Sequence, residues 1–95
     1  MRGRKVVEAS NSELDYLYDS IERWYSRYLE MGDVSAYFMF KDDVEIAENY
    51  AELLLRSGKI GSEELFRFMN YCDEKLELLK NALNLSDEDT VERFA

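Results

Sequence analysis

Two pairs of glutamates carry the one spacing in this chain that suits catalysis. Glu45 and Glu48 form the first pair, and Glu74 and Glu77 form the second. Residues three positions apart on a helix are neighbours on its surface, so each pair brings two carboxylates together. In a helical bundle, such pairs suit a metal site if they point inward. The orientation of the helices therefore decides whether these residues can do chemistry.

The two pairs resemble the magnesium site of the all-α nucleoside triphosphate pyrophosphohydrolases of the MazG type. The resemblance implies that Glu45, Glu48, Glu74 and Glu77 would hold Mg²⁺ and that the metal would activate water against nucleotide phosphates. It covers eight residues, and Glu77 stands where the family usually has aspartate.

The apolar pattern turns both pairs away from the core. Val44 and Ala47 lie on the apolar seam of one helix, which places the first pair on its flank and outer face. Cys72 and Leu76 lie on the seam of the next helix and turn the second pair outward as well. We therefore expect no catalytic residue, no metal site and no cofactor, and we expect that the protein is not an enzyme.

Amino-acid composition argues against several other classes of function. Histidine is absent, which removes the usual general base and most zinc sites. The net charge of −9 argues against direct binding to nucleic acid, because that affinity depends on clustered Lys and Arg. No apolar run reaches about 18 residues, so we expect no membrane span. The single cysteine, Cys72, fits a reducing cytoplasm, and its place on an apolar seam predicts an inert buried thiol. The charged fraction of 35% and the absence of glutamine favour a thermophilic source.

Three long periodic segments predict an all-α fold in one domain over residues 1–95. Proline is absent, and glycines separate the segments as helix stops do. We predict a basic arm, three main helices and one short helix, over residues 1–10, 12–31, 33–57, 62–84 and 87–94. The expected N-caps of the second and third helices are Asp33 and Ser62. An alternative makes residues 36–40 a strand and starts the second helix at Asp42.

Each main helix carries an apolar seam with alternating spacings of three and four residues. The expected architecture is an antiparallel three-helix bundle with knobs-into-holes packing. The seam positions are Leu14, Leu17, Ile21, Trp24, Tyr28 and Met31, then Tyr37, Phe40, Val44, Ala47, Ala51 and Leu54, and then Leu65, Met69, Cys72, Leu76, Leu79 and Leu83.

The stretch from Trp24 to Phe40 holds six of the thirteen aromatic residues. In an antiparallel hairpin that turns at Gly32, these rings come together at one end of two helices. A stacking platform for nucleic acid needs flanking positive charge, and only Arg27 and Lys41 are close. We therefore predict that the aromatic stretch is packed core.

The second and third helices carry more apolar residues than one bundle needs. We predict that a second row on each helix forms an interface with a second copy, most simply in a dimer, or with another protein. Asp43 and Lys75 interrupt these rows at the same level, so we predict an ion pair between them. The predicted interface residues are Met39, Asp43, Ile46, Tyr50, Leu53, Phe68, Tyr71, Lys75 and Leu78.

Three functions from different classes follow from these observations. The first is a small acidic non-enzymatic protein that acts by protein–protein interaction or self-assembly in the cytoplasm. The second is an acidic mimic of nucleic acid that inhibits a DNA- or RNA-binding protein, with acidic rows at Asp15, Asp19 and Glu22 and at Glu45, Glu48 and Glu52. The third is the magnesium-dependent pyrophosphohydrolase named above. We favour the first.

Overall fold

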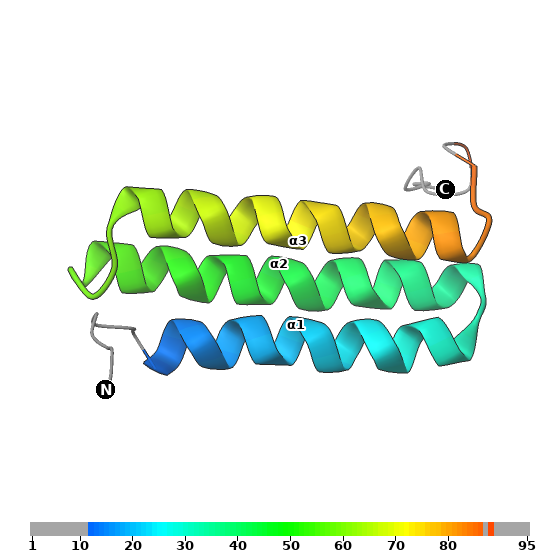
Figure 1. The fold of residues 1–95 in the computed structure, drawn as a ribbon, viewed down its shortest axis with the longest axis horizontal. Helices are drawn as coiled ribbons and strands as arrows, with labels where there is room; N and C mark the ends of the chain where they lie inside the picture. The colour runs from blue at the N-terminus through cyan, green and yellow to red at the C-terminus, as the bar shows by residue number, and fades with distance from the viewer. Residues whose placement is uncertain (1–11, 87, 89–95) are drawn as a thin grey trace, which may run out of the picture.

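Three helices form an antiparallel bundle in the computed structural model, which describes residues 12–86 and residue 88. Helix α1 spans Ser12–Met31, α2 spans Val34–Arg56 and α3 spans Ser62–Ala82. The helices lie side by side, with the α1–α2 connection at one end and the α2–α3 connection at the other (Figure 1). The predicted all-α bundle is confirmed. The predicted arm over 1–10 lies outside the described residues, as does the short helix over 87–94 apart from residue 88.

The α1–α2 connection has the residues that a tight helix–helix turn requires. Gly32 adopts a φ of +75°, a left-handed conformation that glycine takes without steric cost, and its N–H donates to the Tyr28 carbonyl at 3.2 Å. Asp33 is the N-cap of α2, and its side chain accepts from the Ala36 N–H at 3.0 Å. Residues 36–40 lie inside α2, so they are helix, and the alternative start at Asp42 is wrong.

The α2–α3 connection differs from the prediction in one detail. The N-cap of α3 is Gly61, and Ser62 is the first helical residue. The Glu64 carboxylate accepts from the Gly61 N–H at 2.7 Å, so a side chain from the first turn caps the helix. This bond satisfies the N–H of the N-cap residue itself, and no side chain at the N-cap position accepts from the N–H groups of the first turn.

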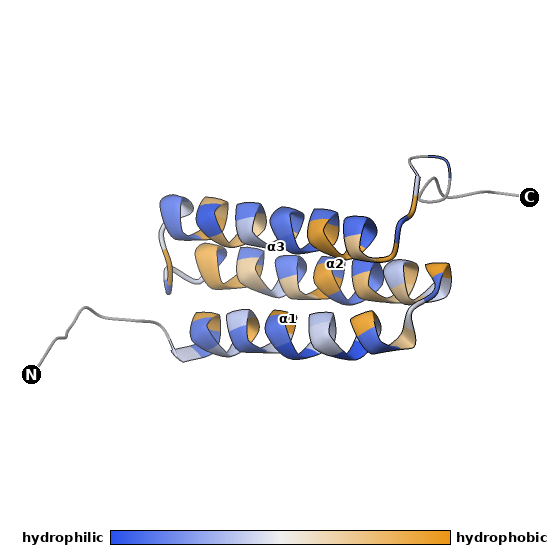
Figure 2. Ribbon diagram, turned by 45° about the vertical axis from the view of Figure 1, so that its right-hand side comes forward, coloured by the Kyte–Doolittle hydropathy of each residue, from blue (hydrophilic) through white to orange (hydrophobic). Residues whose placement is uncertain are grey.

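The buried face of α2 matches its predicted seam at every position, but the other two helices deviate. Met31 of α1 is 46% exposed, and Trp24 is only partly buried. On α3, Phe68 is fully buried although it lies outside the predicted seam. Hydrophobic and hydrophilic segments alternate along all three helices, as expected for amphipathic helices (Figure 2). The buried apolar residues are Leu14, Leu17, Ile21, Tyr28, Ala36, Tyr37, Phe40, Val44, Ala47, Ala51, Leu54, Ile60, Phe68, Cys72 and Leu79.

The aromatic stretch contributes to the core as predicted. Phe40 is fully buried, and the ring centroids of Tyr25 and Tyr28 lie 6.1 and 6.0 Å from its own. Tyr37 is also buried, and the Phe38 ring packs edge-on against it at 5.5 Å. Aromatic rings at these separations attract one another beyond the burial of their area. None of the described helices is long and apolar enough to cross a bilayer.

The burial pattern predicts a large difference between two phenylalanines. We expect Phe40→Ala to lower the free energy of unfolding by about 3–5 kcal/mol, because the side chain is fully buried and its loss leaves a cavity. Phe66→Ala is the matched control, and it should change stability by less than about 0.5 kcal/mol because that ring is 65% exposed. Urea unfolding followed by circular dichroism measures both. Similar losses in the two variants would contradict this core.

Candidate functional site

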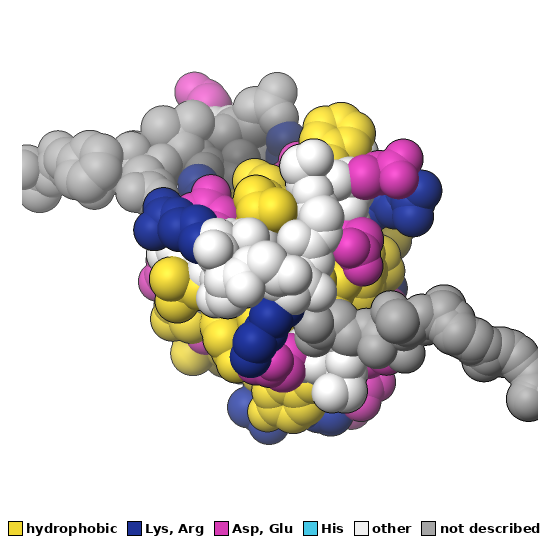
Figure 3. All heavy atoms as spheres, turned by 90° about the vertical axis from the view of Figure 1, so that its left-hand side faces the viewer, with side chains coloured by type: hydrophobic (Ala, Val, Ile, Leu, Met, Phe, Trp, Pro, Cys, Tyr) yellow, Lys and Arg dark blue, Asp and Glu magenta, His cyan; other side chains and the backbone are white. Residues whose placement is uncertain are grey.

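The second row of α2 is mostly exposed. Met39, Ile46 and Leu53 are 45%, 65% and 52% exposed, and we call these three residues the α2 outer row. They are spaced seven residues apart, so they follow one side of the helix along most of its length. Hydrophobic side chains also reach the surface on other sides of the bundle, as seen from the end where the α2–α3 connection lies (Figure 3). The α2 outer row differs from these in that its three members follow one side of a single helix.

The other two members of the α2 second row turn toward α1. The Tyr28 hydroxyl donates to Asp43 Oδ2 at 2.5 Å. The Tyr50 hydroxyl donates to Glu13 Oε2 at 2.6 Å. Because Asp43 and Tyr50 alternate with the outer row, the row runs along the edge of α2 that borders α1.

The second row of α3 faces a different side of α1. Phe68 and Tyr71 pack edge-on against Tyr18, with ring centroids 5.0 and 4.9 Å apart. The Lys75 ammonium lies 2.9 Å from Glu22 Oε2, and Tyr71 donates to the same carboxylate. The second rows of α2 and α3 are therefore separated by α1, and they do not form one surface.

Two predictions about these rows are wrong for this reason. Phe68 cannot be an interface residue in this arrangement, because it is fully buried in the core. Asp43 and Lys75 do not pair with each other: Asp43 is bonded to Tyr28, and Lys75 is bonded to Glu22. The predicted register used only the α2–α3 hairpin, whereas α1 supplies a nearer partner for each charge. Of the predicted α3 positions, Tyr71 and Lys75 are partly buried, and Leu78 is 50% exposed.

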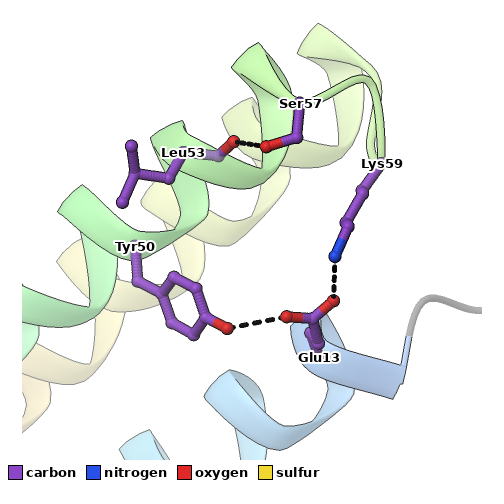
Figure 4. A network of polar contacts seen from close by, with 5 residues as sticks. All are labelled: Glu13, Tyr50, Leu53, Ser57 and Lys59. Carbon is purple, nitrogen blue, oxygen red and sulfur yellow. Dashed lines mark hydrogen bonds and ion pairs between the residues drawn. The ribbon is translucent and has the colours of Figure 1, made fainter.

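A polar network joins the start of α1 to the last turns of α2 and to the α2–α3 connection (Figure 4). The Glu13 carboxylate accepts from Tyr50 at 2.6 Å and from Lys59 Nζ at 3.0 Å. The hydrogen bond from Tyr50, followed by the one from Lys59, lowers the pKa of Glu13. The hydrogen bond between Tyr50 and Glu13 also raises the pKa of Tyr50. The Ser57 hydroxyl donates to the Leu53 carbonyl at 2.6 Å and helps to end α2.

The glutamate pairs do not converge in the structure. Glu45, Glu74 and Glu77 are exposed, and Glu48 is partly buried between α2 and α3. Burial, followed by the nearby charges of Asp73, Glu45 and Glu52, raises the pKa of Glu48. Among the described residues, no group of three or more acidic or cysteine side chains is arranged to hold a metal ion. A shallow depression beside Leu78 is lined by Glu74, Glu77 and Asn81, all from α3.

Cys72 is fully buried and forms no disulfide. Burial first, and then the charges of Glu48 and Asp73, raises the pKa of its thiol to about 12. A thiol with this pKa is protonated near neutral pH, and the thiolate is the nucleophilic form. Cys72 therefore has the character of a packing residue.

The Tyr28–Asp43 contact generates a prediction about alkaline pH. The hydrogen bond to Asp43, followed by burial, raises the pKa of Tyr28 above 10.0, so the unfolded chain loses this proton first as the pH rises. We expect Tyr28→Phe to cost about 1–2 kcal/mol at pH 7. The difference from the wild type should shrink as the pH rises above 10, where the contribution of Tyr28 is lost. Unfolding by urea at a series of pH values measures the difference.

Tyr16→Phe is the control for that experiment, because Tyr16 is 60% exposed. It should leave the stability and its pH dependence close to those of the wild type. A difference between Tyr28→Phe and the wild type that stays constant up to pH 12 would contradict the proposed bond.

Comparison with known proteins identifies no relative of this chain: no protein-family model, no curated protein and no solved structure matches it.

Proposed function

We propose that this protein acts without catalysis, by binding another protein chain through the α2 outer row. The observation that carries the proposal is the exposure of Met39, Ile46 and Leu53 along one edge of a helix whose opposite face is fully packed. Met39 and Leu53 are fourteen residues apart, so the row is about 21 Å long. Exposed apolar side chains that follow one face of a helix offer a surface on which another chain can pack.

The surroundings of the row fit an interface. Asp42 and Asn49 are exposed on the flank away from α1, and Tyr50 borders the row on the other side. Protein interfaces commonly combine an apolar centre with a polar rim. Burying the three half-exposed side chains contributes on the order of 1 kcal/mol each, so neighbouring contacts must add to the affinity.

We place this interaction in the cytoplasm. The support is the single cysteine, Cys72, which is buried and reduced. Chains that fold in oxidising compartments commonly rely on paired cysteines when they are this small.

The acidic-mimic function has weaker support. It needs carboxylates that are ordered and unpaired along parallel rows. Asp19 is paired with Arg23 at 3.1 Å, and Glu22 is paired with Lys75 at 2.9 Å. Glu48, in the acidic row on α2, is partly buried. Ion pairs therefore neutralise two carboxylates of the acidic row on α1, and burial makes one carboxylate of the acidic row on α2 less accessible to a partner.

The pyrophosphohydrolase function is also less well supported than binding. It needs both glutamate pairs to point toward one shared cation. Three of the four carboxylates are exposed, and the fourth lies beside other acids. We therefore keep binding through α2 as the proposed function.

Ile46→Glu tests the proposal, because it places a charge at the centre of the row. We expect the variant to lose the protein that the tagged wild-type chain captures, whether that is another protein or an untagged copy of this chain. The physical reason is that burying an unpaired carboxylate costs several kcal/mol. Capture from an extract of the source cells, quantified by mass spectrometry, measures the loss.

Phe66→Glu is the matched control, since Phe66 is as exposed as Ile46 but lies on α3. It should retain the captured protein. Circular dichroism should show that both variants keep their helical content. Equal capture by the wild type and Ile46→Glu would refute the proposed function.

A further inference from the structure

We propose that the chain that covers the α2 outer row is a second copy of this protein, with the two α2 helices packed antiparallel across a two-fold axis at Ile46. This inference rests on the proposed function and names its partner. Two observations carry it: the even spacing of the row, and the distribution of charge on either side of Ile46.

The α2 outer row is self-complementary. Met39 and Leu53 lie seven residues before and after Ile46, so both are the same distance from it along the helix. A two-fold axis at Ile46 brings Ile46 against its own counterpart and Met39 against Leu53 of the second copy. Positions seven residues apart drift by about 20° per step, which a helix crossing of about 20° accommodates. Two identical symmetric rows can therefore mate along their full length.

The charges beside the row select the antiparallel direction. Asp42 and Asp43 precede Ile46 by four and three residues, whereas the uncharged Asn49 and Tyr50 follow it by three and four. A parallel pair would bring the acids of both copies to one level, where they repel. An antiparallel pair instead places Asp42 and Asp43 of each copy at the level of Asn49 and Tyr50 of the other, and it brings Asp42 close to Asn49 of the second copy. The Asn49 amide can then donate to the Asp42 carboxylate.

The arrangement of α1 leaves this approach open. Asp43 and Tyr50 are held by Tyr28 and Glu13, on the side of α2 that borders α1. The exposed Asp42 and Asn49 lie on the other flank. The outer row between these two flanks is the part of α2 that a second helix can contact without displacing α1.

The proposed geometry is within reach of a disulfide. Packed helices have axes about 8–10 Å apart, and Cα atoms lie about 2.3 Å from each axis, so facing Cα atoms are about 3.4–5.4 Å apart. This separation overlaps the range for disulfides, which is about 4.4–6.8 Å. Cysteine at position 46 would face its own counterpart. Two cysteines at position 39 would lie about 21 Å apart in the same dimer, which is too far for a bond.

Cysteine cross-linking of the full-length chain tests both the partner and the direction. Ile46→Cys should form a covalent dimer under mild oxidation at micromolar concentration, with a yield at least about fivefold above that of Phe66→Cys. Met39→Cys and Leu53→Cys should each remain uncrosslinked alone, and they should form a mixed dimer when combined. The native Cys72 does not interfere, because it is fully buried. Non-reducing electrophoresis and mass spectrometry identify each product.

Light scattering of proteins without an introduced cysteine completes the test. The wild type should have twice the chain mass of 11.3 kDa, and Ile46→Glu should have the mass of one chain. A wild-type monomer, or equal cross-linking by Ile46→Cys and Phe66→Cys, would overturn the inference. Cross-linking of Met39→Cys to itself would overturn the antiparallel direction. If self-association fails while Ile46→Glu still loses a captured protein of another kind, this inference falls and the proposed function stands.

Discussion

The packing of α1 against both α2 and α3 is the interaction on which the rest of this structure depends. Ile21 of α1, Phe40 of α2 and Phe68 of α3 are each completely buried, so the core is shared by three helices. A hairpin of two helices has no third surface to cover its remaining apolar side. The position of α1 therefore determines which apolar residues become core and which stay at the surface.

Tyrosines that reach carboxylates reinforce this position at the edges of the core. Tyr28 bonds to Asp43, Tyr50 bonds to Glu13, and Tyr71 bonds to Glu22, and each bond joins α1 to a neighbouring helix. A tyrosine can pack its ring against apolar neighbours while its hydroxyl remains near polar groups. Carboxylates are abundant in a chain with 21 acidic residues, so each of these hydroxyls has an acceptor on a neighbouring helix.

The same arrangement gives α2 and α3 different surfaces. Helix α3 buries Phe68 and half-buries Tyr71 and Lys75 against α1, and this contact uses most of its second apolar row. Of the α2 second row, only the polar-tipped positions, Asp43 and Tyr50, turn toward α1. The α2 outer row remains exposed, and this exposure is the basis of the binding surface that we propose on α2.

Local sequence patterns were enough to predict the helices and the α2 seam, because helix periodicity and the turn at Gly32 depend on neighbouring residues alone. They also indicated that α2 and α3 have surplus apolar rows. They could not show that Phe68 is core or that Asp43 and Lys75 have separate partners, because both outcomes depend on α1, which is distant in sequence from α3. The rotation of each helix about its own axis is set by all three packing contacts together, and only the tertiary structure decides it.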